Sequence, residues 1–263
     1  MDLDAYLARI GYSGSRAPTL DTLHALTKAH ATSIPFENLD VLLGQPIELE
    51  MGRVFDKLVT RRRGGYCFEQ NTLFLSVLES LGFAAEPLSA RVRLNRPRDF
   101  LPPRTHVFLR VTVAGEPWLT DVGVGAASLT SAIRFVIDEP QVTPHDTRRL
   151  VREGAVWMHQ VRWGDTWQDV YEYTGEGMPP IDREVANWFT SAHPRSHFRG
   201  RVMVARALPD GGRISVQDRE LTIRDPGGRT SHQRQLTSNE ELLEVLCDRF
   251  ALELPAGTRL LLT

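Results

Sequence analysis

The sequence contains little of what marks several protein classes. Its 263 residues include only two cysteines, Cys67 and Cys247, which cannot build a disulfide framework, so a reducing cytosol is the expected compartment. The net charge is −2, from 31 basic and 33 acidic residues, and this balance gives no basic footprint for nucleic acid. No apolar run approaches the ~20 residues of a transmembrane helix. We therefore expect a cytoplasmic protein with neither nucleic acid nor membrane as a partner.

Two further absences narrow the chemistry. His193 and His197 lie four residues apart, but Pro194 breaks the helix that a metal-binding pair would need, and no Cys or Glu pattern completes a site. The segment GVGAAS, residues 123–128, lacks the third glycine and the lysine of a phosphate loop. We therefore expect no metal ion and no Walker-type nucleotide site.

Hydrophobic periodicity divides the chain into three parts. Residues 1–83 are predicted to be mostly helical, and residues 84–190 alternate as in an antiparallel sheet or small barrel. Residues 191–263 combine short strands with one amphipathic helix, where Ser238 and Glu241 have the spacing of a capping box. The pattern predicts an α+β fold. The domain boundaries are soft, because no low-complexity linker separates the parts.

Cys67 follows the double glycine of RRRGGYCFEQN, residues 61–71, at the start of the clearest predicted helix. Apolar residues recur there at three- or four-residue spacing as far as Leu81, and Gly82 suits a left-handed cap. In the first turn of a helix, unpaired N–H groups and the helix dipole favour an anion such as a thiolate. Cys67 is therefore a candidate nucleophile, with a buried small hydrophobe as the alternative. Cys247 is interpreted as a core residue of the last predicted helix.

A cysteine nucleophile needs a base, and the base needs an orienting group. Most of the eight histidines fit surface helices, loops or turns, whereas His106 begins the predicted strand THVFLRV. The next strand contains Asp121, which costs free energy among apolar residues unless it is paired. If Gly115 and Glu116 form a two-residue hairpin loop, Asp121 falls opposite Arg110, four residues or roughly 13 Å from His106. The local pattern leaves a structural and a functional role for His106 equally open.

Five segments resemble the arylamine N-acetyltransferase family: SIPFENLD, RRRGGYCFEQN, THVFLRV, WLTDVGVG and ANWFTSAHPRSHF. They occur in the family's order, and the resemblance covers essentially the whole chain. The Cys, His and Asp blocks have matching separations, 39 residues from 67 to 106 and 15 residues from 106 to 121. The resemblance implies that the fold brings Cys67, His106 and Asp121 together as a catalytic triad.

The resemblance also implies a fold and an activity. The fold is an N-terminal helical bundle over residues 1–83, a central antiparallel β-barrel over residues 84–190 and a C-terminal α/β lid over residues 191–263. Its triad architecture is like that of cysteine proteases. The implied activity is a ping-pong transfer of acetyl from acetyl-CoA, as co-substrate, to an arylamine or hydrazine, with coenzyme A as the other product. The family resemblance is also compatible with a homo-oligomer.

Five residues match positions that line the acceptor pocket in the family: Phe36, Phe68, Val92, Val124 and Phe198. Packing in the core is the alternative for each of them, most strongly for Phe68. Val124 departs from the common pattern, since many relatives have Phe there. A smaller side chain is expected to widen the pocket and to change acceptor preference.

Coenzyme A is expected to contact loops. Thr105, Gly123 and Gly125 flank the triad residues, and glycine there would let pantetheine approach the backbone. Arg229 and Arg234 in the lid are candidates for the phosphates, although solvated arginines are the simpler interpretation.

The resemblance gives Arg63 a structural role. It implies an ion pair with Glu37 or Asp40 that clamps the Cys67 turn to the first helices. Replacement of Arg63 is therefore expected to lower stability more than it alters the intrinsic chemistry.

Two other classes of function stay open at this point. A Cys-His-Asp acyl hydrolase or transglutaminase-like enzyme would use the same three residues. A non-catalytic binding protein would carry Cys67 only as a structural thiol and would form no acyl-enzyme.

Overall fold

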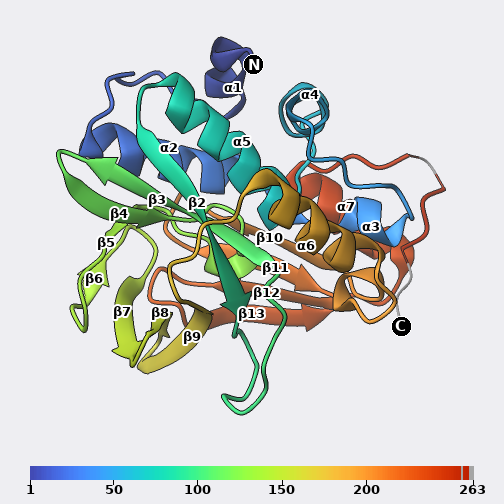
Figure 1. Cartoon of the computed structure of the whole chain (residues 1–263). Helices are drawn as coiled ribbons and strands as arrows, with labels where there is room; N and C mark the ends of the chain where they lie inside the picture. Colours follow the sequence, from blue (N-terminus) through green and yellow to red (C-terminus); the bar gives the residue numbers. More distant parts are fainter. Residues whose placement is uncertain (256, 261–263) are drawn as a thin grey trace.

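The computed structural model describes residues 1–255 and 257–260 (Figure 1). Helices gather in the N-terminal part, a large antiparallel sheet follows, and a second sheet with a covering helix ends the chain. Within this part of the chain, no helix is both long enough and apolar enough to cross a membrane.

The N-terminal part is built around one buried helix, α5. Its elements are α1 (Leu3–Arg9), α2 (Leu20–Ser33), β1 (Phe36–Glu37), α3 (Leu39–Leu42), α4 (Met51–Phe55), the π-helical turn η1 (Asp56–Thr60) and α5 (Cys67–Ser80). Large apolar side chains of α5, among them Phe74 and Leu78, pack on Tyr6, Leu23 and Leu26 of α1 and α2. Full burial of each such side chain contributes about 1.5–3 kcal/mol. The predicted helix after Cys67 is confirmed, and Gly82 has the left-handed φ of 84° expected after its end.

The central part is a nearly closed antiparallel barrel. Its strands are β2 (Ala84–Val92), β3 (His106–Val113), β4 (Glu116–Thr120), β5 (Ile133–Arg134), β6 (Gln141–Val142), β7 (Thr147–Glu153), β8 (Val156–Trp163) and β9 (Thr166–Tyr173), in the order β5-β4-β3-β2-β9-β8-β7-β6. Between the two edge strands, the Gln141 side chain accepts from the Arg134 N–H at 2.7 Å and donates to the Arg134 carbonyl at 3.0 Å. The turn η2 (Gly125–Ala127) follows β4. The α+β class with a central barrel is confirmed.

The C-terminal part shares its sheet with the N-terminal part. Its elements are α6 (Pro180–Ala192), η3 (His197–Arg199), β10 (Met203–Ala207), β11 (Arg213–Gln217), β12 (Glu220–Arg224), β13 (Thr230–Gln235) and α7 (Asn239–Phe250). The sheet order is β1-β10-β11-β12-β13, with Phe36 of β1 paired to Ala205 of β10. Strand β1, from the N-terminal part, joins this sheet, and helix α6 runs through residue 190. The domain boundaries at residues 83 and 190 therefore stay predictions.

Helix α7 confirms one sequence interpretation and corrects another. The Ser238 hydroxyl accepts from the Glu241 N–H at 3.1 Å, as the capping-box spacing predicted. Cys247, however, is exposed and does not lie in the core. The buried positions of α7 are Leu242, Val245, Leu246 and Phe250. Cys247 follows Leu246 and is turned about 100° away from it around a helix of 3.6 residues per turn.

The hairpin between β3 and β4 differs from the expected one by a single residue. Its turn is Ala114–Gly115, with φ values of 52° and 82°, instead of Gly115–Glu116. Because Leu109 pairs with Thr120, the register carried one residue further sets Asp121 beside Phe108. Asp121 is therefore displaced by two residues from His106 and not by four. Diagonal neighbours at that offset lie roughly 7–8 Å apart and are within reach of long side chains.

Candidate active site

The two glycines before Cys67 allow a close backbone crossing. The Gly65 carbonyl accepts from the Glu37 N–H at 3.0 Å, and the Gly65 N–H donates to the Pro35 carbonyl at 3.3 Å. A Cβ on Gly64 would lie 2.2 Å from that same Pro35 oxygen, so no larger residue fits there. The turn is thus fixed against β1, and Cys67 becomes the first residue of α5.

The structure brings the three predicted triad residues together. His106 Nε2 and Asp121 Oδ2 lie 2.7 Å apart. A carboxylate only accepts hydrogen bonds, so Nε2 carries the proton of that bond and Nδ1 is left for the thiol. The Cys67 Sγ lies 3.7 Å from the carbonyl oxygen of Thr105, the residue before His106, and the charge of Cys67 is among the influences on the pKa of His106. All three residues are buried, with Cys67 4 % exposed.

The surroundings of His106 favour its charged form. Burial alone would lower the pKa of the imidazole. The charge and hydrogen bond of Asp121, together with the neighbouring Cys67, outweigh burial and raise the pKa of His106 to about 10. The site can therefore hold a proton on His106 at neutral pH next to the sulfur atom.

Asn71 orients Asp121, a role that the sequence analysis did not assign. It lies one turn after Cys67 on α5, and its Nδ2 donates to Asp121 Oδ1 at 2.9 Å and to the Val107 carbonyl at 2.8 Å. The Gly123 N–H donates to the same Asp121 oxygen at 2.9 Å. A Cβ on Gly123 would lie 2.8 Å from the Cys67 Cα, so this loop touches the nucleophile's backbone. The available signal was a polar residue on the apolar face of the helix, four positions after the cysteine.

A buried ionic network lies behind the Cys67 turn. Lys57 Nζ is 2.7 Å from both Glu69 Oε1 and Asp40 Oδ2. Arg63 Nη2 is 2.8 Å from Glu37 Oε1 and 2.9 Å from Asp40 Oδ1, so the expected pairing of Arg63 is confirmed with both carboxylates. Burial would lower the pKa of Lys57, but the neighbouring carboxylates raise it above its ordinary value. The network ties α3, η1 and α5 together beneath the site.

The five predicted acceptor-pocket residues divide between two apolar clusters. Phe36, Phe68 and Phe198 pack in the cluster that contains Cys67, with the Phe36 and Phe198 rings 6.4 Å apart. Val92 and Val124 belong to the cluster inside the barrel. Phe68 is fully buried, so packing accounts for its place, and its contact with substrate stays a prediction.

One hollow of the surface adjoins the triad. It has a volume of about 570 Å³ and is lined by Thr105 together with Met178, Ala186 and Phe189. Met178 and Ala186 also pack in the apolar cluster that contains Cys67. The Thr105 carbonyl oxygen contacts the Cys67 thiol, and Thr105 also lines this hollow. A ligand in the hollow could therefore reach Thr105.

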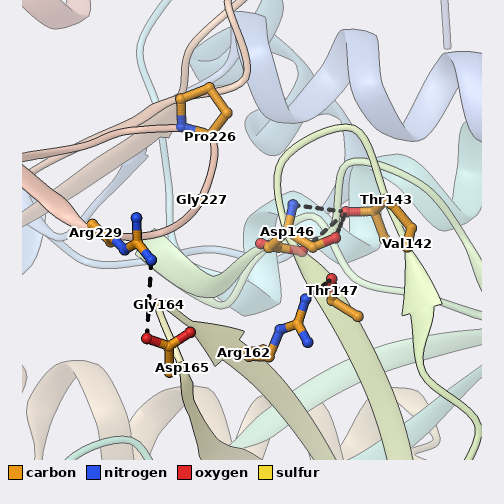
Figure 2. A pocket seen from close by; sticks show the side chains of 10 residues that line it. All are labelled: Val142, Thr143, Asp146, Thr147, Arg162, Gly164, Asp165, Pro226, Gly227 and Arg229. Atoms are coloured by element: carbon orange, nitrogen blue, oxygen red, sulfur yellow. Dashed lines mark hydrogen bonds and ion pairs between the residues drawn. The ribbon is translucent and has the colours of Figure 1, made fainter.

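The two lid arginines considered for phosphate lie apart from the triad. Arg229 lines a separate hollow of about 390 Å³ and points toward Asp165, 3.9 Å away (Figure 2). No triad residue lines that hollow. Arg234 pairs with Glu241 at the start of α7. Both arginines are exposed, which fits the simpler interpretation of solvated ion pairs.

Three other histidines are buried, contrary to the expectation of surface positions: His30, His145 and His159. His30 Nε2 lies 2.6 Å from Gln70 Oε1, and its Nδ1 lies 2.8 Å from the Tyr6 hydroxyl. Burial lowers the pKa of His30 to about 4, so it is neutral at pH 7. In the described part of the chain, no group of three or more His, Cys, Asp and Glu side chains is arranged to hold a metal ion.

Comparison with known proteins places the chain in a family. A model of an N-acetyltransferase family matches residues 19–259. The arylamine N-acetyltransferase of Escherichia coli K12 is 42% identical over 250 residues, which cover 95% of this chain and 88% of that protein. The one from Mycolicibacterium smegmatis is 44% identical over 258 residues, covering 97% and 93%. The chain belongs to the arylamine N-acetyltransferase family.

Solved structures of the family agree with the fold of this enzyme. The Salmonella typhimurium arylamine N-acetyltransferase has a TM-score of 0.90 at 37% identity, covering 98% of this chain and 94% of that one. The Mycobacterium marinum arylamine N-acetyltransferase in complex with CoA has a TM-score of 0.91 at 40% identity, covering 95% and 92%. The expectation of an acetyltransferase is confirmed.

Proposed function

We propose that Cys67, His106 and Asp121 are the catalytic residues of a two-step transfer of acetyl from acetyl-CoA to the nitrogen of an arylamine or arylhydrazine. One observation carries the proposal: the His106 imidazole lies 2.7 Å from the Asp121 carboxylate, and the Cys67 thiol at the first residue of α5 lies 3.7 Å from the carbonyl of Thr105, the residue before His106. The names of the relatives and the CoA complex of the Mycobacterium marinum structure support these substrates.

The first half-reaction loads the cysteine. His106 Nδ1 takes the thiol proton, or already holds it in a thiolate–imidazolium pair, and the Cys67 sulfur attacks the carbonyl carbon of the thioester. The N–H groups of the first turn of α5, beginning with that of Cys67, have no acceptor within the helix and are placed to stabilise the oxyanion. The carbon–sulfur bond to coenzyme A then breaks, and coenzyme A leaves as a thiol with the proton from His106. Acetyl remains on Cys67.

The second half-reaction transfers the acetyl group from Cys67 to the amine. An aromatic amine is neutral at pH 7, so its nitrogen lone pair can attack the acetyl carbonyl directly. His106 removes the extra proton from the nitrogen as the amide forms. The bond from the acetyl carbon to Cys67 breaks, and the proton returns to the sulfur. Asp121 holds the His106 ring in one orientation and one tautomer throughout.

The walls of the site fit this assignment. Phe36 and Phe198 offer aromatic faces beside Cys67, and Val92 and Val124 extend the apolar surface into the barrel. These four residues, together with Phe68, would contact the acceptor. Contacts of coenzyme A with Thr105, Gly123 and Gly125 remain part of the proposal, since all three flank the triad.

The test is to mix the protein with acetyl-CoA, omit any amine, and measure intact mass with peptide mapping. The exposed Cys247 provides a matched control, because it is the other thiol of the same chain. We expect one acetyl group on Cys67 in the native protein and in Cys247→Ala, and none in Cys67→Ala. Acetylation of Cys247 alone, or of neither cysteine, would contradict the proposal.

A further inference from the structure

A second buried charge cluster lies outside the triad, where the barrel meets the C-terminal sheet. Asp146 forms a two-point contact with Arg148, whose Nε and Nη2 lie 2.6 and 2.7 Å from the two carboxylate oxygens. Arg213 Nη2 lies 2.7 Å from Asp146 Oδ2, and Thr143 donates to Asp146 Oδ1 at 2.9 Å (Figure 2). The side chains of Asp146, Arg148 and Arg213 are at most 3 % exposed.

The cluster contains two guanidinium groups and one carboxylate. Removing charges from water is costly unless the remaining donors meet acceptors, and among the described residues Arg213 Nε and Nη1 meet none. Arg148 meets this need on the side facing the site: its Nη1 donates to the Ala127 carbonyl at 2.9 Å and its Nη2 to the Ser128 carbonyl at 3.5 Å. Arg148 therefore joins Asp146 to the end of η2.

From there the contacts lead to the active-site loop. The Ser128 hydroxyl accepts from the Val124 N–H at 3.0 Å, and the Ser128 N–H donates to the Gly125 carbonyl at 3.0 Å. The Leu129 N–H donates to the Asp121 carbonyl at 2.7 Å, which closes the loop just after the triad aspartate. The Val124 N–H is thus held by Ser128, and Arg148 holds the backbone of the Ala127–Ser128 segment, most closely at the Ala127 carbonyl.

We propose that Arg148, held by Asp146 and acting through Ser128, is a positioning residue that sets Val124 and so selects the acceptor amine. The inference rests on the proposed function, because it assumes that Val124 contacts the acceptor. Arg213 comes from β11, so the same cluster also anchors the loop to the C-terminal sheet. A role in stability alone would lower the amount of folded enzyme without changing its choice between two amines.

Two variants and one control test the proposal. Ser128→Ala removes the hydroxyl that accepts from Val124 and leaves the buried ions in place. Arg148→Met removes the guanidinium and keeps a side chain of similar length. Ser131→Ala is the control, since its hydroxyl contacts His24, which takes no part in this chain of contacts.

The first readout is the ratio of kcat/KM for 2-aminofluorene to that for aniline, which does not depend on how much enzyme is folded. We expect Ser128→Ala to change this ratio by at least about threefold, Arg148→Met to change it in the same direction, and Ser131→Ala to leave it as in the native protein. A native ratio in Ser128→Ala would overturn the proposal, whether or not Arg148→Met folds.

The second readout needs no turnover. Amide hydrogen exchange at Val124 should be faster in both test variants than in the native protein and unchanged in Ser131→Ala. If the native protein acetylates neither amine, the proposed function fails, and the exchange rate still decides whether Ser128 and Arg148 fix Val124. Unchanged exchange at Val124 in Ser128→Ala would refute the positioning role by itself.

Discussion

Helices α5 and α7 each contain one of the two cysteines, but they differ in what surrounds their polar side chains. Helix α7 buries four apolar residues and leaves its polar face, Cys247 included, in solvent. Helix α5 also buries the polar residues of its first turns: Glu69 pairs with Lys57, Gln70 contacts His30, and Asn71 holds Asp121.

Helix α7 therefore contributes to the fold, whereas helix α5 also positions the residues of the site. A buried polar side chain is tolerated only when a partner satisfies it. Each polar side chain in the first turns of α5 therefore ties the helix to another segment, and together these ties hold Cys67 at a defined place. Since α7 has few such ties, replacements on its polar face should leave catalysis unchanged.

The largest expected difference is between the two cysteines. Cys67→Ser should lower kcat/KM for acetyl transfer by at least about 1,000-fold, because a serine hydroxyl is a far weaker nucleophile than a thiolate. Cys247→Ser should stay within about twofold of the native value, as its sulfur is exposed and far from any step of the reaction. Steady-state kinetics of both variants would measure this difference, and equal losses of kcat/KM in the two variants would contradict it.

The ion pairs next to the two helices should differ in stability. Arg63→Ala leaves Glu37 and Asp40 without their guanidinium partner in a largely buried network, which should cost about 3–5 kcal/mol in the free energy of unfolding. The control, Arg234→Ala, breaks the exposed pair with Glu241 and should cost about 0–1 kcal/mol. Urea unfolding would measure both, and native stability combined with lost acetylation in Arg63→Ala would refute its structural role.

An asparagine on each helix provides a smaller contrast. Asn71→Ala removes a donor to Asp121 and leaves the Val122 N–H without its acceptor, so kcat/KM should fall by about 10- to 100-fold, or ~1.4–2.8 kcal/mol. Asn239→Ala removes comparable contacts, to Thr258 and Leu260, and should lower thermal stability only. Activity measured per folded molecule separates the two effects, and a similar activity in both variants would count against the role of Asn71.

A further contrast lies in the dependence of stability on pH. The pKa of His106 rises from 6.5 to about 10 on folding, so the stability gained from its pairing is complete below pH 6.5 and is lost as the pH rises toward 10. The difference in unfolding free energy between native protein and Asp121→Asn should therefore shrink over this alkaline range. A difference that is constant from pH 6.5 to 10 would be inconsistent with the raised pKa of His106.

At α7, the dependence of stability on pH has the opposite sign. Hydrogen bonds from Thr237 and Arg234 lower the pKa of Glu241 from 4.5 to about 2, so its contribution is present above pH 4.5 and is lost as the pH falls toward 2. Glu241→Gln should change the stability profile only on the acid side, which makes it the matched control for Asp121→Asn.

The sequence predicted the elements that follow from periodicity and caps. The spacing of apolar residues located α5, alternation located β3, and Ser238 with Glu241 located the start of α7. The candidate triad could be proposed from residue types, although its mutual contact depended on a family resemblance. These features are local, so a single chain segment contains the information.

The rest depends on contacts between distant segments. A turn at Ala114–Gly115 instead of one residue later decides whether Asp121 can reach His106, and both dipeptides suit a tight turn. Asn71 has the same spacing pattern whether it is buried or exposed. Asp146 and Arg148 alternate like surface strand residues, but contacts with remote segments, Ala127 for Arg148 and Arg213 for Asp146, bury them. Burial of polar residues by remote elements leaves no local signal.

The most direct test of the account is the fate of the acetyl group on Cys67. The acetylated protein would be separated from acetyl-CoA and mixed in a rapid-quench device with aniline or with buffer alone, and the remaining acetyl-Cys67 would be measured by mass. We expect aniline to remove the acetyl group at least about 100-fold faster than water, with formation of one equivalent of acetanilide. Equal rates with and without aniline would contradict it and would indicate an acyl hydrolase.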